Sequence, residues 1–226
     1  MDMHSIFHQL HYRTQQVLDL AFPPKCASCK RVGSVLCQAC FAQLQPATPL
    51  LYRQGWSALQ GLVAVNSYQG PLRNCIHALK YDGVVRLAEP LGTLLAHTYL
   101  NYGLQADMLM SVPLHNERQK QRGYNHAHLL ADVCASLISV ALREDVLVRS
   151  RATNAQAGLN AYDRRQNVAG AFAIAARDAT TCIYGRRIII VDDVCTTGAT
   201  LDACAATLFQ AGAASVWGLV LAGSAT

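Results

Sequence analysis

Four cysteines near the N-terminus could bind a metal ion. They form two Cys-x-x-Cys pairs with seven residues between them: Cys26, Cys29, Cys37 and Cys40. Thiolates bind Zn²⁺ tetrahedrally at about 2.3 Å, and a two-residue spacing lets one tight turn present both sulfurs to the same ion. A redox-active pair is an alternative, but tandem copies favour a metal. Since protein ligands would fill every position, the pattern predicts a structural zinc site whose metal supplies most of the module's folding energy.

A second stretch, RIIIVDDVCTTGATL (187–201), places acidic residues before small and hydroxyl-bearing ones. Its apolar run predicts a buried parallel strand that carries Asp192 and Asp193 to its carboxyl end, where open α/β sheets bind ligands. The two carboxylates can accept hydrogen bonds from vicinal hydroxyls. The loop and helix start that follow could cradle a phosphate with backbone N–H groups. The cradle would consist of Thr196, Thr197, Gly198, Ala199 and Thr200. The alternative is a plain strand–turn–helix with the acid pair in solvent.

A basic stretch, SVPLHNERQKQRGYN (111–125), follows another short apolar run. A proline at its third position forbids further central strand. Arg118, Lys120 and Arg122 then place three cations within five positions, and Gly123 permits a bend. Such a loop could enclose a pyrophosphate, which carries several negative charges. A solvated basic loop is the alternative.

The elements that must position these residues alternate between strands and helices. We expect strands at 61–68, 108–112, 146–148, 187–191 and 215–222. We expect helices at 5–21, 72–80, 89–102, 125–142 and 200–211, the last ending before a glycine at its C′ position. This alternation predicts an α/β fold with a doubly wound, mainly parallel sheet. A polar, Pro-containing linker at 45–54 separates a helix and zinc module in residues 1–45 from the α/β domain in residues 55–226.

The composition excludes several other classes of protein. Apolar types form 52% of the 226 residues and charged types 15%, which is too apolar for a disordered chain. No apolar run reaches the roughly 18 residues of a spanning helix, so we expect no membrane insertion. The N-terminus lacks a signal peptide and the nine cysteines are an odd count, so we expect a reducing, cytoplasmic location. A net charge of +5 permits an anionic partner without requiring nucleic acid.

The stretch VDDVCTTGAT resembles the phosphoribosyl-pyrophosphate (PRPP) signature of type I phosphoribosyltransferases. The resemblance implies that fold, with the cysteine module as a small zinc-ribbon-like addition. It also implies PRPP as the ligand and Mg²⁺ as its cofactor. Asp192 and Asp193 would hold the ribose 2′- and 3′-hydroxyls close to Mg²⁺, and residues 196–200 would hold the 5′-phosphate.

Further motifs resemble the ComF family, which includes GntX and is associated with competence and the use of extracellular DNA. The basic stretch is similar to its VPVPLHxxRxxxRGxN motif, which implies pyrophosphate contacts by Pro113, Leu114, Arg118, Arg122 and Asn125. YQGPLRNCIHALKYDG (68–83) resembles the motif YxGxxRxxIxxxKYxG, and the double Cys-x-x-Cys also matches. Residues at family spacing between 151 and 172 are Arg151, Thr153, Gln156, Leu159, Arg164, Asn167, Val168, Gly170 and Phe172. His126 stands where the family usually has Gln, which would make a ligand contact there pH-sensitive.

Three functions are compatible with this sequence. The first is a Mg²⁺-dependent phosphoribosyltransferase of unknown acceptor, for which the sequence identifies no catalytic residue. The second is a non-catalytic DNA-handling accessory protein that PRPP or a related nucleotide regulates, with single-stranded DNA or a competence-machinery protein as partner. The third is a PRPP sensor. No basic stripe interleaved with aromatic residues, the pattern that stacks single-stranded bases, is visible in the sequence.

Overall fold

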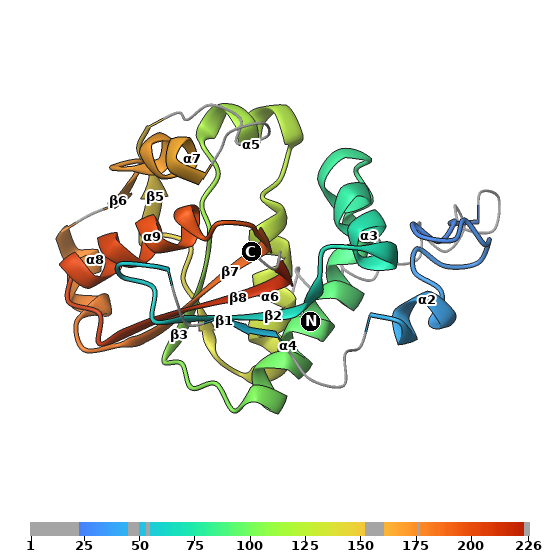
Figure 1. Cartoon of the computed structure of the whole chain (residues 1–226), viewed down its shortest axis with the longest axis horizontal. Coiled ribbons are helices and arrows are strands. Elements are labelled where there is room, and N and C mark those ends of the chain that lie inside the picture. The colour runs from blue at the N-terminus through green and yellow to red at the C-terminus, as the bar shows by residue number, and fades with distance from the viewer. Residues whose placement is uncertain (1–22, 45–49, 53–54, 152–160, 176, 224–226) are drawn as a thin grey trace, which may run out of the picture.

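A mainly parallel sheet forms the centre of the computed structural model, which describes residues 23–44, 50–52, 55–151, 161–175 and 177–223. Within these residues the sheet has six strands in the order β1-β2-β8-β7-β3-β4 (Figure 1). They are β1 (Leu50–Tyr52), β2 (Gly61–Ser67), β8 (Ser215–Gly223), β7 (Arg187–Cys195), β3 (Met108–Ser111) and β4 (Ala141–Leu142). β1 pairs antiparallel with β2, and the other neighbours are parallel. A separate antiparallel pair consists of β5 (Leu147–Arg149) and β6 (Phe172–Ile174).

Helices cover both faces of the sheet, because its central strands are apolar on both sides. On β7, Ile189 and Val191 belong to one core cluster, whereas Ile188 and Ile190 belong to the other. The first cluster contains side chains of α3 (Gly70–Tyr81), α4 (Ala88–Tyr102) and α6 (His126–Ile138). The second contains side chains of α7 (Ala161–Val168), α8 (Arg177–Ile183) and α9 (Ala199–Gln210). The predicted doubly wound α/β fold is therefore confirmed.

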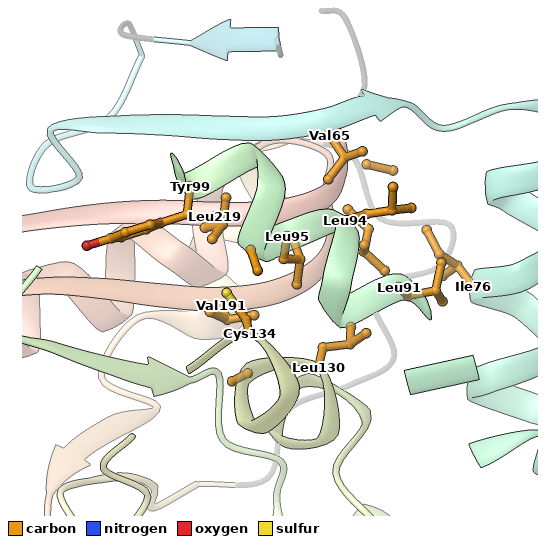
Figure 2. Packing of buried hydrophobic residues seen from close by; sticks show 14 of the residues in the cluster. Val65, Ile76, Leu91, Leu94, Leu95, Tyr99, Leu130, Cys134, Val191 and Leu219 are labelled. Carbon is orange, nitrogen blue, oxygen red and sulfur yellow. The ribbon is translucent and has the colours of Figure 1, made fainter. Parts of the chain in front are cut away.

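Close packing of α4 on α6 organises the first cluster. Leu91, Leu94 and Leu95 of α4 pack in one cluster with Leu130 and Cys134 of α6 and with Val191 and Leu219 of the sheet (Figure 2). The two helices approach at a glycine of α4, where an added Cβ would lie 2.6 Å from a valine Cβ of α6. The two helices therefore pack closely at this point.

Three element boundaries differ from the sequence predictions. The helix expected over 125–142 ends at Ile138, because Ser139 adopts a left-handed conformation (φ 56°) and the chain then enters β4. The expected linker is shorter, since Leu50–Tyr52 forms the edge strand β1. β7 continues beyond Val191 to Cys195, so the acidic pair lies within the strand rather than after it.

Other expectations have mixed outcomes. Gly212 follows α9 with φ 94°, as predicted for its C′ glycine. The basic loop contains a short helix, α5 (Asn116–Arg122), which the sequence analysis did not predict. The helix expected over 5–21 lies outside the described residues, as do residues 153, 156 and 159 of the family-like segment. Among the helices that the structure describes, none is both long and apolar enough to cross a membrane.

The cysteine module packs beside α3 at one end of the molecule (Figure 1). Its first Cys-x-x-Cys pair lies in a tight turn, where the Cys26 N–H donates to the Arg31 carbonyl at 2.8 Å and the Lys30 N–H donates to the Cys26 carbonyl at 2.9 Å. The second pair begins α2 (Gln38–Ala42). Ala27 and Leu44 share the first core cluster with α3, so the module is attached through apolar contacts.

Candidate functional site

The candidate site lies where the strand order reverses. From β3 the chain passes through α5 and α6 to β4 on one side, and from β7 it passes through α9 to β8 on the other. The helices α6 and α9 cover opposite faces, so a crevice opens between the carboxyl ends of β3 and β7. Open α/β sheets bind ligands at such switch points. The basic stretch and the acidic pair both emerge here.

A cavity of about 750 Å³ occupies this crevice. Side chains from four elements of the chain supply its charges. The cationic ones are Lys80, Arg118, Arg122 and Arg149, and the acidic ones are Asp192 and Asp193. The remaining lining residues are Tyr81, Gly83, Val112, Leu114, Gln121, Tyr124, His126, Val194 and Thr200. Cations outnumber carboxylates, so the cavity suits a ligand with several negative charges.

Asp193 is the buried anchor of the site, with 2% of the residue exposed. Its Oδ2 lies 2.6 Å from the Lys80 Nζ and 3.1 Å from the His126 Nε2. Burial alone would raise the pKa of Asp193, but the nearby Lys80 and His126 lower it below its usual value. Burial alone would lower the pKa of Lys80, but the nearby Asp193 carboxylate raises it above its usual value. Asp193 therefore remains a carboxylate that fixes α3 and α6 to β7.

His126 extends this network toward the basic stretch. Its Nδ1 lies 2.7 Å from a guanidinium nitrogen of Arg122. Arginine has only donors, so the His126 Nδ1 accepts and the ring proton lies on Nε2, facing Asp193. Arg122 also lies over the Tyr81 ring, with its Cζ 5.3 Å from the ring centroid. His126 therefore positions the Arg122 guanidinium, which lines the cavity.

Asp192 differs from its neighbour in environment. Consecutive strand residues point to opposite faces, and the electrostatic neighbours of Asp192 include Arg149 and Cys204 on the α9 side of the sheet. Burial, followed by repulsion from Asp193, raises the pKa of Asp192 to about 7. Its Oδ1 accepts the Asp193 N–H at 2.9 Å. Asp192 is half-buried and lines the cavity, so its carboxylate is the more available of the two.

The predicted phosphate loop forms a narrow cradle of about 20 Å³ next to the cavity. The cradle opens onto the larger cavity because Asp192, Val194 and Thr200 line both. Gly198 is the N-cap of α9 and has φ 75°, a conformation that favours glycine. The predicted phosphate residues 196–200 all line this cradle. The structure thus brings the loop, the acid pair and the cations together.

Only some of the residues predicted to bind pyrophosphate line the cavity. Among the described residues, Leu114, Arg118 and Arg122 line the cavity, whereas Pro113 and Asn125 are absent from its lining. Asn125 instead caps α6, because its Oδ1 accepts the Ala127 N–H at 3.0 Å. Its Nδ2 donates to the Val112 carbonyl at 3.1 Å, which ties the helix start to the end of β3. Asn125 therefore shapes the loop from behind.

Three residues at the site were missed by sequence reasoning. Lys80 lies in the KYDG sequence that matches the family motif KYxG, so that motif could have identified it. Arg149, on β5, precedes Arg151 by two positions, and a basic pair at a strand end is a weak signal. Trp56 donates its Nε1–H to the Thr197 carbonyl at 3.0 Å, and no local sequence pattern indicates that contact.

The four cysteines of the module meet the requirements of a metal centre. Their Sγ atoms all lie within 4.8 Å of one another, and the Cys29 and Cys37 sulfurs are 3.6 Å apart. Tetrahedral zinc with bonds of about 2.3 Å would space sulfurs by about 3.8 Å. The Cys37 N–H also points to the Cys26 Sγ at 3.5 Å. This donor set could hold a structural metal ion.

Comparison with known proteins identifies relatives over most of the chain. DNA utilization protein YhgH of Escherichia coli (strain K12) is 33% identical over 201 residues, which are 84% of this chain and 85% of the relative. Competence protein F of Haemophilus influenzae is 37% identical over 118 residues, or 51% of each chain. Competence protein ComFC of Bacillus subtilis is 28% identical over 198 residues, covering 84% of this chain and 73% of the relative.

Comparisons with family models and with solved structures do not assign the chain to a family. No model of a protein family matches the chain. Among solved structures, glutamine PRPP amidotransferase from Bacillus subtilis, complexed with ADP and GMP, matches with a TM-score of 0.40 and 20% identity over 59% of this chain and 25% of that chain. That score is too low to establish a shared fold, so the fold rests on the observed strand order. The identity and coverage of the YhgH relatives show that the chain belongs to the ComF family of DNA utilization and competence proteins.

Proposed function

We propose that the chain binds PRPP, together with Mg²⁺, in the cavity between β3 and β7. One observation carries this proposal: a carboxylate pair, a cluster of cations and a small-residue cradle at a helix start face one cavity at the switch point of the sheet. PRPP carries a ribose diol between a phosphate and a diphosphate, so it can use all three groups at once.

The cavity geometry suggests a division of roles. Asp192 would accept hydrogen bonds from the ribose diol, with residues 196–200 around the 5′-phosphate. Arg118 and Arg122 would bind the diphosphate, and Arg149 adds a third cation that faces the same space. Asp193 would act mainly through Lys80 and His126, because both already contact its carboxylate. Pro113 and Asn125 would shape the diphosphate loop, and Leu114 would form part of its wall.

Two metals complete the proposal. Zn²⁺ in the module would be held by Cys26, Cys29, Cys37 and Cys40, and it would supply folding energy only. Mg²⁺ would neutralise diphosphate charge and keep several waters. Asp192 is the carboxylate best placed to lie near Mg²⁺, since Asp193 is committed to Lys80. The relatives are named for DNA utilization and competence, and we propose that this ligand site serves the use of DNA.

The reaction that fits such a site is transfer of the phosphoribosyl group. The bond between ribose C1′ and the pyrophosphate oxygen would break, a bond from C1′ to an acceptor would form, and pyrophosphate would leave with the bonding electrons. The transition state is positive at the ribose, so the chain's contribution is positioning and charge neutralisation.

Calorimetry with PRPP and Mg²⁺ tests the binding step. Wild type should give a clear binding heat, and Asp192→Asn should weaken binding by at least about tenfold, because a charge-assisted hydrogen bond contributes roughly 1.5–3 kcal/mol. Asp145→Asn, which removes an exposed carboxylate paired with Arg143, is the matched control and should bind normally. Equal heats for wild type and Asp192→Asn would contradict the assigned role.

A screen for pyrophosphate release tests the reaction. Purines, pyrimidines and amines are offered in turn as acceptors, with PRPP and Mg²⁺ present. Release that depends on an acceptor would establish a transferase. PRPP binding without release for any acceptor would instead support a PRPP-regulated accessory protein or sensor.

A stripe along α3 favours DNA handling as a second candidate function. Arg73, His77 and Tyr81 are exposed and recur every four residues, so they share one face of the helix. The His77 and Tyr81 rings lie 4.9 Å apart, and Arg122 lies beside Tyr81 at the cavity rim. This stripe joins basic and aromatic side chains that the sequence analysis did not connect. Tyr81→Ala should weaken binding of a fluorescent oligothymidylate, because base stacking contributes about 1–3 kcal/mol.

A further inference from the structure

The segment that precedes β2 contacts the phosphate loop directly. We call residues 55–60 the Trp56 segment. The indole Nε1–H of Trp56 donates to the Thr197 carbonyl at 3.0 Å, over a separation of 141 positions in the chain. The indole also fills the space beside Gly198, where an added Cβ would lie 2.0 Å from Nε1. The half-buried ring thus lies against the backbone of the cradle.

The peptide between Thr197 and Gly198 is held from both sides. In a trans peptide the carbonyl and the N–H point in opposite directions. The carbonyl accepts from Trp56, and the Gly198 N–H is hydrogen-bonded to the Cys195 side chain. Gly198 then adopts φ 75° and begins α9. The orientation of this one peptide determines where the following backbone N–H groups point.

Asp202 fastens the Trp56 segment to α9. Its Oδ2 accepts the Ser57 N–H at 3.0 Å and the Ser57 hydroxyl at 2.9 Å. Its Oδ1 accepts the Ala58 N–H at 2.7 Å and the Leu59 N–H at 2.9 Å. Burial alone would raise the pKa of Asp202, but these donors lower it, so the carboxylate stays charged. One helix residue therefore holds the segment that carries the indole.

We infer that Trp56 is a positioning residue for the 5′-phosphate loop: its indole sets the orientation of the Thr197–Gly198 peptide and thereby the phosphate affinity. The inference rests on the proposed function, because it assigns a cause to the shape of the same cradle. It adds an element that the PRPP-like motif does not contain. Trp56 acts through the Thr197 carbonyl and the Gly198 backbone, without touching the ligand.

Calorimetry with two simple anions tests this inference. Ribose 5-phosphate carries the phosphate and the diol, whereas inorganic pyrophosphate addresses the cationic end of the cavity. Trp56→Phe keeps an aromatic ring and removes the Nε1–H donor. We expect it to weaken ribose 5-phosphate binding about three- to tenfold, in line with the loss of one hydrogen bond, and to change pyrophosphate affinity less than about twofold. Asp202→Asn should give the same pattern, because an amide cannot accept from all four donors.

A fluorescence measurement provides a readout that a general loss of stability would not reproduce. The chain has two tryptophans, so Trp217→Phe leaves Trp56 as the only reporter. Ribose 5-phosphate should change its emission, and pyrophosphate should leave it unchanged. Wild-type affinity for ribose 5-phosphate in Trp56→Phe, or equal losses for both anions, would overturn the inference alone. If wild type bound neither ribose 5-phosphate nor pyrophosphate, the proposed function would be overturned as well.

Discussion

The cysteine module and the ligand cavity are built in opposite ways. All four sulfurs of the module come from 15 consecutive residues, 26–40, and two local turns bring them within 4.8 Å of one another. The cavity instead collects charged side chains from α3, α5, β5 and β7, which only the complete sheet brings together. A site built from local turns can be held together by a bound metal ion, whereas a site assembled from distant segments depends on packing. The two regions should therefore fail under different perturbations.

Removing one sulfur should have the largest effect, and it should be confined to the module. Cys40→Ser should lower zinc from about one per chain to near zero, because a structural site needs all four ligands. Mass spectrometry of the metal and limited proteolysis near residues 26–40 would measure this loss. Cys182→Ser, outside the module, should keep its zinc. Retention of zinc in Cys40→Ser would contradict the four-sulfur centre. Loss of ribose 5-phosphate binding in Cys40→Ser would show that the cavity depends on the module.

Removing the charge of Asp193 should have the next largest effect, and it should lower the stability of the whole α/β domain. Asp193→Asn should reduce the free energy of unfolding by about 3–5 kcal/mol, because Lys80 would keep its charge in a mostly buried position without a carboxylate. Denaturant titration measures the change. Asp145→Asn breaks an exposed pair with Arg143 and should cost at most about 1 kcal/mol. Similar costs for the two variants would show that the cavity does not depend on this anchor.

A methyl group at Gly198 should test whether the phosphate loop also depends on distant packing. Gly198→Ala should destabilise the protein by about 2–4 kcal/mol, since backbone strain at φ 75° adds to a clash with Trp56. Gly103→Ala, with φ 67° and open space around its Cβ, isolates the strain and should cost about 1–2 kcal/mol. Thermal unfolding compares the two. If Trp56 is the obstacle, adding Trp56→Ala to Gly198→Ala should recover part of the loss.

The pH dependence of Asp192 gives the smallest effect. Its pKa is raised to about 7 in the folded chain, so between about pH 4 and pH 7 the folded state keeps a proton that the unfolded state releases. The contribution of Asp192 to the free energy of unfolding therefore falls as pH rises. A shift of this size would correspond to about 4 kcal/mol without solvent screening. Asp192 is only half-buried, and solvent screens its charge, so Asp192→Asn should be more stable than wild type by about 1 kcal/mol at pH 8, with the difference vanishing near pH 4. Denaturant titrations across this range measure it.

Asp107 offers a control of opposite sign. Hydrogen bonds from Arg187 lower the pKa of Asp107 to about 2. Its stabilising contribution is present above about pH 4 and is lost as pH falls toward 2. Asp107→Asn should therefore be less stable than wild type at pH 8. A destabilised Asp192→Asn at pH 8 would contradict the assigned environment of Asp192.

Sequence reasoning predicted the parts of the fold whose signals are local. The cysteine spacing predicted the module, and the apolar run before Asp192 predicted a central strand. The strand end was misplaced because pairing with β8 carries β7 past two carboxylates as far as Cys195. Charged residues usually suggest a strand end, but here backbone hydrogen bonds and the Lys80 contact compensate for their burial.

The candidate site was predicted only in its linear motifs. The loop at 196–200 and two of the basic residues reached the cavity as expected. The helix α5 was missed because its sequence is polar throughout, and its ends depend on a side-chain cap by His115 and a left-handed Gly123. Trp56 and Arg149 come from segments that approach the site only through tertiary packing. The sequence near Trp56 has no pattern that indicates this approach, and the basic pair of Arg149 and Arg151 is only a weak signal.

The cysteines scattered through the core have a consequence for chemical labelling. Burial raises the pKa values of Cys75, Cys134 and Cys195 to about 12, so at neutral pH they remain protonated thiols with little nucleophilicity. Cys29, by contrast, is exposed in the module. Alkylating reagents should therefore modify the module in preference to these core cysteines whenever the module holds no metal. In a Cys182→Ser background, which removes a half-buried thiol outside the module, the extent of alkylation would report how many molecules lack a bound metal.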